Sequence, residues 1–222
     1  MSFDPEEAGE RDGSREERGE EEAWRRVAAL QLALAATHYP VVIGGSFRTE
    51  NGWETGTSDD ELSLGKQEIV RGAYRWEARA LDSFSWWSCP EMDAVSDFYL
   101  TVQTRQVNGP ADGECGVIFR ANGDDAYGFS LRGDGQCTAY RDYGDEHKTL
   151  LEWRPTLACA GQVNRLTVVG SNSRFVLLVN DQYVGEFADD ALPEGKVGLT
   201  IGLSHEDDTA TFEFSHFELR AP

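Results

Sequence analysis

The chain has 222 residues, and its 40 acidic and 20 basic side chains give a formal net charge of −20 at pH 7. This length is enough for one sandwich-type domain with an extension, and it disfavours a second complete domain. The negative charge disfavours nucleic acid and anionic membranes as partners, because phosphate groups are bound by basic surfaces.

Residues 1–19 are rich in Glu, Asp, Arg and Gly and contain one large apolar side chain, Phe3. Such a segment buries too little apolar surface to offset its ordering entropy, so we expect a disordered acidic tail. Its polar start lacks the basic and apolar regions of a secretory leader. Residues 27–44 are interrupted by polar side chains and Pro40, so no membrane span is expected. These features predict a soluble, cytoplasmic protein.

Residues 20–40 are predicted to form an amphipathic helix, at residues 20–37, followed by a short linker. Trp24, Val27 and Leu34 recur there at helical spacing among strong helix formers. We expect this helix to pack onto the rest of the protein or to mediate self-association. Membrane binding by the helix is disfavoured because its flank is anionic.

Residues 41–222 are predicted to form one all-β domain. About a dozen short runs of β-branched and aromatic residues, separated by turn residues and by no helix, predict a two-sheet antiparallel jelly-roll sandwich. Its most regular part is a predicted antiparallel meander, with strands at residues 98–107, 116–121, 126–132 and 136–143.

Alternation along these strands assigns the side chains to two faces. One face is apolar and should point into the core. If neighbouring strands pair in meander order, the opposite face carries a polar set that is the candidate binding face: Gln103, Arg105, Arg120, Arg132 and Tyr140. The alternative interpretation is an ordinary solvated sheet face, because antiparallel sheets commonly expose one polar face.

Two adjacent indoles, Trp86 and Trp87, should point to opposite sides of one strand. One of them is expected in the core and the other is available to a ligand. A sugar-binding sheet needs an aromatic plane for the CH face of the ring and planar donors for its hydroxyl groups. Trp86 or Trp87 could supply the plane, the polar face could supply the donors, and Asp142 would suit the acceptor role. The same residue types also dominate protein–protein interfaces.

Residues 46–219 resemble the concanavalin A-like lectin/glucanase jelly rolls, in particular the branch with laminin-G-like and keto-disaccharide-hydrolase-related domains. The resemblance implies the jelly-roll fold, which hosts lectins, glycosidases and interaction modules alike. The residues that carry it are Phe47, Gly52-Trp53, Gly72-x-Tyr74-x-Trp76, Asp97-Phe98-Tyr99-Leu100, Gly116-Val117-Ile118-Phe119-Arg120, Tyr127-Gly128-Phe129, Gly135, Leu151-Glu152-Trp153, Asn164-Arg165-Leu166, Val179-Asn180, Gly195-x-Val197-Gly198-Leu199 and Phe214-x-x-Phe217.

Laminarinase-like glycosidases of this fold carry Glu-x-Asp-x-x-Glu or Glu-x-Asp-x-Glu, whose outer carboxylates act as nucleophile and general acid. The nearest segment here is residues 91–96, in which Ser96 and Val95 stand where the last carboxylate is required. We therefore expect no catalytic residue at the family position. A glycoside hydrolase with a different carboxylate pair remains the alternative.

No metal or cofactor site is expected. The Asp-rich segments at residues 58–61, 124–125, 189–190 and 206–208 lack calcium-loop spacing, and the four histidines show no paired ligand spacing. The four cysteines have no CxxC spacing, and free thiols are predicted.

The sequence thus predicts a non-catalytic binding module that recognises carbohydrate through the polar face of one sheet. A protein-interaction or assembly module, using the same face or the helix, is the second hypothesis. A glycoside hydrolase of the same fold is the third.

Overall fold

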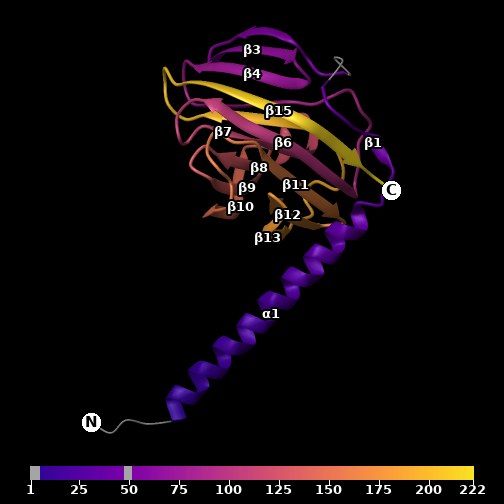
Figure 1. Ribbon diagram of the computed structural model, residues 1–222, viewed down its shortest axis with the longest axis vertical. Coiled ribbons are helices and arrows are strands. Elements are labelled where there is room, and N and C mark those ends of the chain that lie inside the picture. The colour runs from indigo at the N-terminus through magenta and orange to yellow at the C-terminus, as the bar shows by residue number, and fades with distance from the viewer. Residues whose placement is uncertain (1–5, 48–51) are drawn as a thin grey trace, which may run out of the picture.

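A computed structural model describes residues 6–47 and 52–222 of the protein, with helix side chains described from residue 19 onward. Figure 1 shows a β-sandwich from which one long helix projects. The elements are α1 (Glu6–Ala36), β1 (Val41–Ile43), β2 (Gly56–Asp59), β3 (Ser63–Val70), β4 (Ala73–Ala80), β5 (Phe84–Ser88), β6 (Phe98–Asn108), β7 (Glu114–Asn122), β8 (Asp125–Arg132), β9 (Gln136–Tyr143), β10 (Glu146–Pro155), β11 (Asn164–Ser171), β12 (Arg174–Val179), β13 (Gln182–Ala188), β14 (Lys196–Leu203) and β15 (Thr209–Arg220).

The strands form two antiparallel sheets. The nine-stranded sheet has the order β13-β12-β11-β6-β15-β4-β3-β2, with β1 paired to β15. The six-stranded sheet has the order β10-β9-β8-β7-β14-β5. Two sheets joined in this way make the predicted jelly-roll sandwich.

Alternating side chains of both sheets fill the core, as expected for strands with one buried face. In β4, Tyr74, Trp76 and Ala78 are buried, whereas the intervening residues are partly exposed. Tight turns join many strands. Between β3 and β4, Arg71 and Gly72 have φ values of 52° and 82°, the positive values that a tight two-residue hairpin turn requires.

Three of the four predicted meander strands, β7, β8 and β9, pair in the predicted order, and β10 continues the meander beyond β9. The strand before them, β6, belongs to the other sheet and lies between β11 and β15. The loop from residue 109 to 113 therefore carries the chain across the sandwich. The assumption that β6 pairs with β7 was wrong, because alternation within a strand does not report its neighbour.

Helix α1 begins at Glu6, so residues 6–19 are helical where disorder was predicted; residues 1–5 lie outside the described part. Glu, Arg and Ala are strong helix formers, and Glu and Arg four residues apart can pair along a helix, as Glu21 and Arg25 do at 2.6 Å. These preferences favour continuing the helix toward the N-terminus. Among the described helices, none is long and apolar enough to span a bilayer.

The C-terminal half of α1 packs on the outer face of the nine-stranded sheet. Its small side chains Ala29, Ala33 and Ala36 are buried against Val169 and Val176 of β11 and β12. The larger apolar residues predicted to define its packed face are instead exposed, led by Trp24 at 72 %, with Val27, Leu30 and Leu34. Alanines permit the close approach of helix and sheet that bulkier side chains would block.

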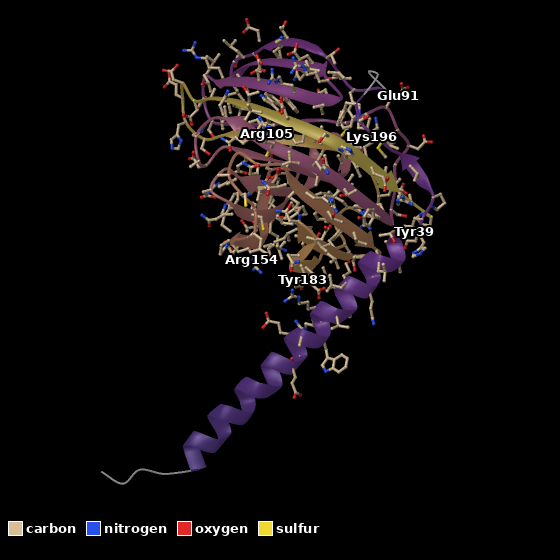
Figure 2. The ribbon with its side chains drawn as sticks, in the orientation of Figure 1. Tyr39, Glu91, Arg105, Arg154, Tyr183 and Lys196 are labelled. Atoms are coloured by element: carbon tan, nitrogen blue, oxygen red, sulfur yellow. The ribbon has the colours of Figure 1, made fainter. Side chains whose placement is uncertain are left out.

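The end of α1 is fixed by the last strand. Arg220 donates hydrogen bonds to the carbonyl oxygens of Thr37 and Tyr39, at 2.9 and 3.3 Å. The backbone nitrogen of Ala221 donates to the Pro40 carbonyl at 3.1 Å. Figure 1 shows the C-terminus beside β1 at this corner, and Figure 2 shows Tyr39 at the end of the helix.

Candidate binding groove on the six-stranded sheet

The outer face of the six-stranded sheet carries a groove of about 360 Å³. Small residues on this face leave room for it, such as Gly128 and Ser130 of β8. A Cβ atom at Gly128 would lie 2.1 Å from Cζ of Tyr140, so only glycine lets the Tyr140 ring lie against the sheet here. The groove is lined by Ser85, Glu114, Thr138, Tyr140, Asp142, His147, Thr149 and Trp153.

Glu114, Arg132 and Trp153 form a row of contacts along one part of this groove, in which the guanidinium lies between the carboxylate and the indole ring. Arg132 of β8 donates from Nη2 and Nε to Oε1 of Glu114 on β7, at 3.1 and 3.3 Å. The Arg132 guanidinium lies 3.7 Å from the ring centroid of Trp153 on β10. This ion pair and cation–π contact hold three long side chains in one arrangement.

Burial raises the pKa of the Glu114 carboxyl above its ordinary value, and the Arg132 guanidinium opposes that shift. The salt bridge joins two side chains that are each about a quarter exposed. Glu114 can therefore accept hydrogen bonds as a carboxylate, and it can also take up a proton more readily than an exposed glutamate.

Tyr140 and His147 form the second aromatic part of the groove, with ring centroids 5.3 Å apart. His147 Nδ1 lies 2.6 Å from Oδ1 of Asp142. Burial, and then the negative charge of Asp142, raise the pKa of Tyr140, so its hydroxyl stays protonated and able to donate. Rings, hydroxyl groups and carboxylates thus face one groove.

The structure brings two of the seven predicted site residues, Arg132 and Tyr140, to this groove or its immediate wall. Trp87 lies on the same side of β5 as the groove residue Ser85 but packs against Ile118 and Ala126. Trp86 points to the other side of its strand, as predicted for adjacent indoles, and its Nε1 donates to Ser63 Oγ at 2.9 Å.

Gln103 and Arg105 do not belong to the groove, which corrects their predicted placement. Both lie on β6, in the other sheet. Gln103 Oε1 accepts a hydrogen bond from Ser215 at 3.3 Å, and Arg105 is opposite Glu213 in the strand register. Figure 2 shows Arg105 on the face of this sheet. For these two residues the alternative of a solvated polar face describes the structure.

Arg120 was also placed on the binding face, and the structure shows it inside the protein. It has a φ of 52° where the register of β7 shifts, so its side chain leaves the strand alternation. Its guanidinium donates to the carbonyl oxygens of Ser96, Leu192 and Asn172. It is a structural residue, not a ligand-binding one.

The sequence prediction missed six groove residues, which come from four strands: Ser85 of β5, Glu114 of β7, Thr138 of β9, and His147, Thr149 and Trp153 of β10. The alternation of Thr138, Tyr140 and Asp142 along β9 was a usable signal for the groove. Trp153 and Glu114 gave no such signal, because their strands, β10 and β7, reach one face only through pairing with β9 and β8 between them.

One group in the described residues could hold a metal ion. Asp112, His205 and Asp208 offer ligand atoms within 4.8 Å of one another. His205 Nδ1 lies 3.5 Å from a carboxylate oxygen of each aspartate, a geometry that a protonated imidazole also satisfies. The four cysteines are free, which agrees with the predicted thiols.

The fold is a concanavalin A-like jelly roll. The carbohydrate-binding module CBM66 from Bacillus subtilis superposes with a TM-score of 0.60 at 17% identity, over 77% of this chain and 96% of that chain. A galectin-like-fold protein of unknown function from Bacillus subtilis gives 0.58 at 14% identity, over 81% and 95%.

The β-glucanase of Bacillus licheniformis gives a TM-score of 0.53 at 11% identity, over 81% of this chain and 97% of that chain. Likeness at these identities establishes the fold alone. No protein-family profile matches the chain, and no curated protein sequence matches it.

Proposed function

We propose that the protein is a carbohydrate-binding module whose ligand lies in the groove on the six-stranded sheet. The observation that carries this proposal is the stacked arrangement of Glu114, Arg132 and Trp153. It sets an aromatic plane beside a planar donor and an acceptor, which are the groups that a sugar ring and its hydroxyls need. The name of one structural neighbour, a carbohydrate-binding module, is consistent with this proposal.

The charges along the groove favour a neutral sugar. Arg132 is paired with Glu114, and His147 is paired with Asp142. No unpaired cation stands among the described lining residues to balance an anionic ligand. The net charge of −20 also repels polyanions.

A second candidate function is hydrolysis of a glycosidic bond, which the raised pKa of Glu114 favours. A carboxyl with a raised pKa can act as a general acid, and Asp142 supplies another carboxylate in the same groove. Binding ranks first because Arg132 pairs with Glu114 and stabilises its anionic form.

The test is a glycan array of neutral and anionic oligosaccharides, followed by titration of the best ligand. Trp153→Ala and Arg132→Ala should each weaken binding by about tenfold or more, because each removes a contact worth about 1–2 kcal/mol. Trp24→Ala on the helix and the exposed Arg165→Ala are matched controls that should bind normally.

Each outcome decides between the candidates. Binding that survives both groove substitutions would overturn the proposed site. Absence of binding to every glycan would overturn the carbohydrate proposal and favour a protein partner. Release of reducing ends from a bound oligosaccharide, lost in Glu114→Gln, would establish the hydrolase instead.

A further inference from the structure

A second hollow lies at the edge of the sandwich, between β5 of one sheet and β2, β3 and β4 of the other. Its volume is about 180 Å³. We call this hollow the edge slot. It shares no lining residue with the groove on the six-stranded sheet. Gly65 keeps it open, because a Cβ atom there would lie 2.3 Å from Ser58 Oγ.

The edge slot has one aromatic wall and one polar wall. Phe84 and Trp86, which point to the same side of β5, form the aromatic wall, and Trp86 is 38 % exposed. Side chains of β2, β3 and the turn between them form the polar wall, including Ser58 and Gln67. A ligand in the slot therefore meets an apolar plane on one side and hydrogen-bonding groups on the other.

Several of these polar groups have no partner within the protein. Trp76 lines the slot, and its Nε1, 3.8 Å from where a Cβ atom of Gly65 would lie, forms no hydrogen bond with a described residue. The Gln67 amide and the Ser58 hydroxyl likewise lack partners in the described part of the chain. The Trp76 indole N–H is not among the described buried side-chain atoms that lack a partner, so it is open to solvent and an acceptor atom of a ligand can reach it.

The electrostatics of the slot select against anions. Asp60 is the charged residue of the lining, and its Oδ1 accepts hydrogen bonds from the backbone nitrogens of Leu62 and Ser63 at 2.8 and 2.9 Å. It forms no salt bridge with a described residue, and no Lys, Arg or His lines the slot. Its Oδ2 accepts a hydrogen bond from Ser63 Oγ at 3.4 Å and can still accept a second one from a hydroxyl group.

We propose that the edge slot is a second binding site, which takes a single neutral sugar ring. A pyranose or furanose ring has a CH face that stacks on indole and hydroxyl groups that both donate and accept. Ser58 and Gln67 can do both, Trp76 donates and Asp60 accepts. The volume is below the range of about 300–1,000 Å³ for drug-sized ligands, so one ring fits better than a chain.

This second site does not depend on the function proposed for the groove, because it rests on different residues. With so few contacts, the affinity for a free monosaccharide should be about millimolar. Occupancy changes the surroundings of Trp86 and Trp76, so intrinsic fluorescence should respond to it.

The experiment titrates the full chain with neutral aldohexoses and ketohexoses and follows saturation-transfer NMR and tryptophan fluorescence. Glucuronate, which carries a carboxylate, and adenine, which is planar and aromatic, serve as contrasting probes. Gln67→Ala and Trp86→Ala should each weaken sugar binding by about tenfold, and circular dichroism should show that both variants remain folded.

Two matched controls separate the two sites. Gln31→Ala on the helix should bind monosaccharide normally, and Trp153→Ala should lose oligosaccharide binding in the groove while it keeps monosaccharide binding in the slot. The proposal is overturned if no neutral sugar shows saturable binding up to ~100 mM. It is equally overturned if Trp153→Ala abolishes the monosaccharide signal, if the slot variants leave it unchanged, or if adenine alone binds.

Discussion

Arg120 is buried inside the sandwich, where its side chain links three loops by hydrogen bonds. It is 2 % exposed, its guanidinium lies 4.6 Å from the ring centroid of Phe175, and it donates to backbone carbonyls from three separate loops. No described carboxylate forms a salt bridge with it. Burial therefore lowers its pKa, although an arginine remains charged at neutral pH. The charge is stabilised by carbonyl dipoles and an aromatic face.

Arg120→Met should lower the free energy of unfolding by about 2–4 kcal/mol, because it leaves the carbonyls of Ser96, Leu192 and Asn172 without a donor. Urea unfolding followed by fluorescence measures this. Arg165→Met removes an arginine whose salt bridge to Asp181 is solvent-exposed, and it should cost less than about 1 kcal/mol. Equal losses in the two variants would show that Arg120 is not a central support.

At the scale of the elements, the sequence predicted where the strands lie better than it predicted which strands pair with each other. The strand at residues 136–143 was predicted with the observed bounds, because its alternation and flanking Gly-Asp-Gly are local signals. The crossing between β6 and β7 depends on which sheet each strand joins, a tertiary property that alternation does not encode. The error moved Gln103 and Arg105 to the wrong sheet and hid the contact of Arg132 with Trp153.

For the helix, the sequence predicted the element but not the side chains that contact the sheet. Its large apolar residues predicted the contact face, but its alanines make the contact with β11 and β12. Small side chains carry a weak hydrophobic signal in a sequence, although they allow the closest packing. Figure 2 shows Arg154 and Tyr183 at the sandwich edge beside the helix, where a groove of about 400 Å³ opens before α1 leaves the protein surface.

Ala29→Glu should detach α1 from the sheet, because it places an unpaired charge against Val169 and Val176 at a cost of about 2–3 kcal/mol. Trypsin cleavage after Arg25 and Arg26 should then become about tenfold faster. Ala28→Glu is the matched control, because Ala28 precedes Ala29 in the helix and its side chain is exposed. Similar cleavage rates in both variants would contradict the alanine-mediated contact.

At the scale of the whole molecule, the core holds protonated hydroxyls and thiols. Burial raises the pKa of Tyr74 and Tyr127 from 10.0 to about 12, and that of Cys115 from 9.0 to about 12. In the unfolded chain these groups ionise near their ordinary values. The folded state thus binds more protons than the unfolded state in alkaline solution.

The stability contributed by these groups is complete below pH 9 and is lost as the pH rises toward about 12. The urea midpoint of unfolding should therefore fall steadily from pH 8 to pH 11. In the Tyr74→Phe variant this fall should be smaller, because one of the groups responsible is removed. Tyr143→Phe changes an exposed tyrosine, and it should leave the dependence of the urea midpoint on pH unchanged. A Tyr74→Phe slope equal to that of the unaltered protein would refute this origin of the pH dependence.

The position of β15 has a consequence for how the protein is made. This strand, Thr209–Arg220, lies between β6 and β4 and also pairs with β1, so three strands synthesised at least a hundred residues earlier meet on it. On the ribosome, those strands emerge with open edges and no central partner, and the helix lacks the carbonyl contacts of Arg220. The nine-stranded sheet can close only after residue 220 has left the exit tunnel, and until then the nascent chain needs protection from aggregation.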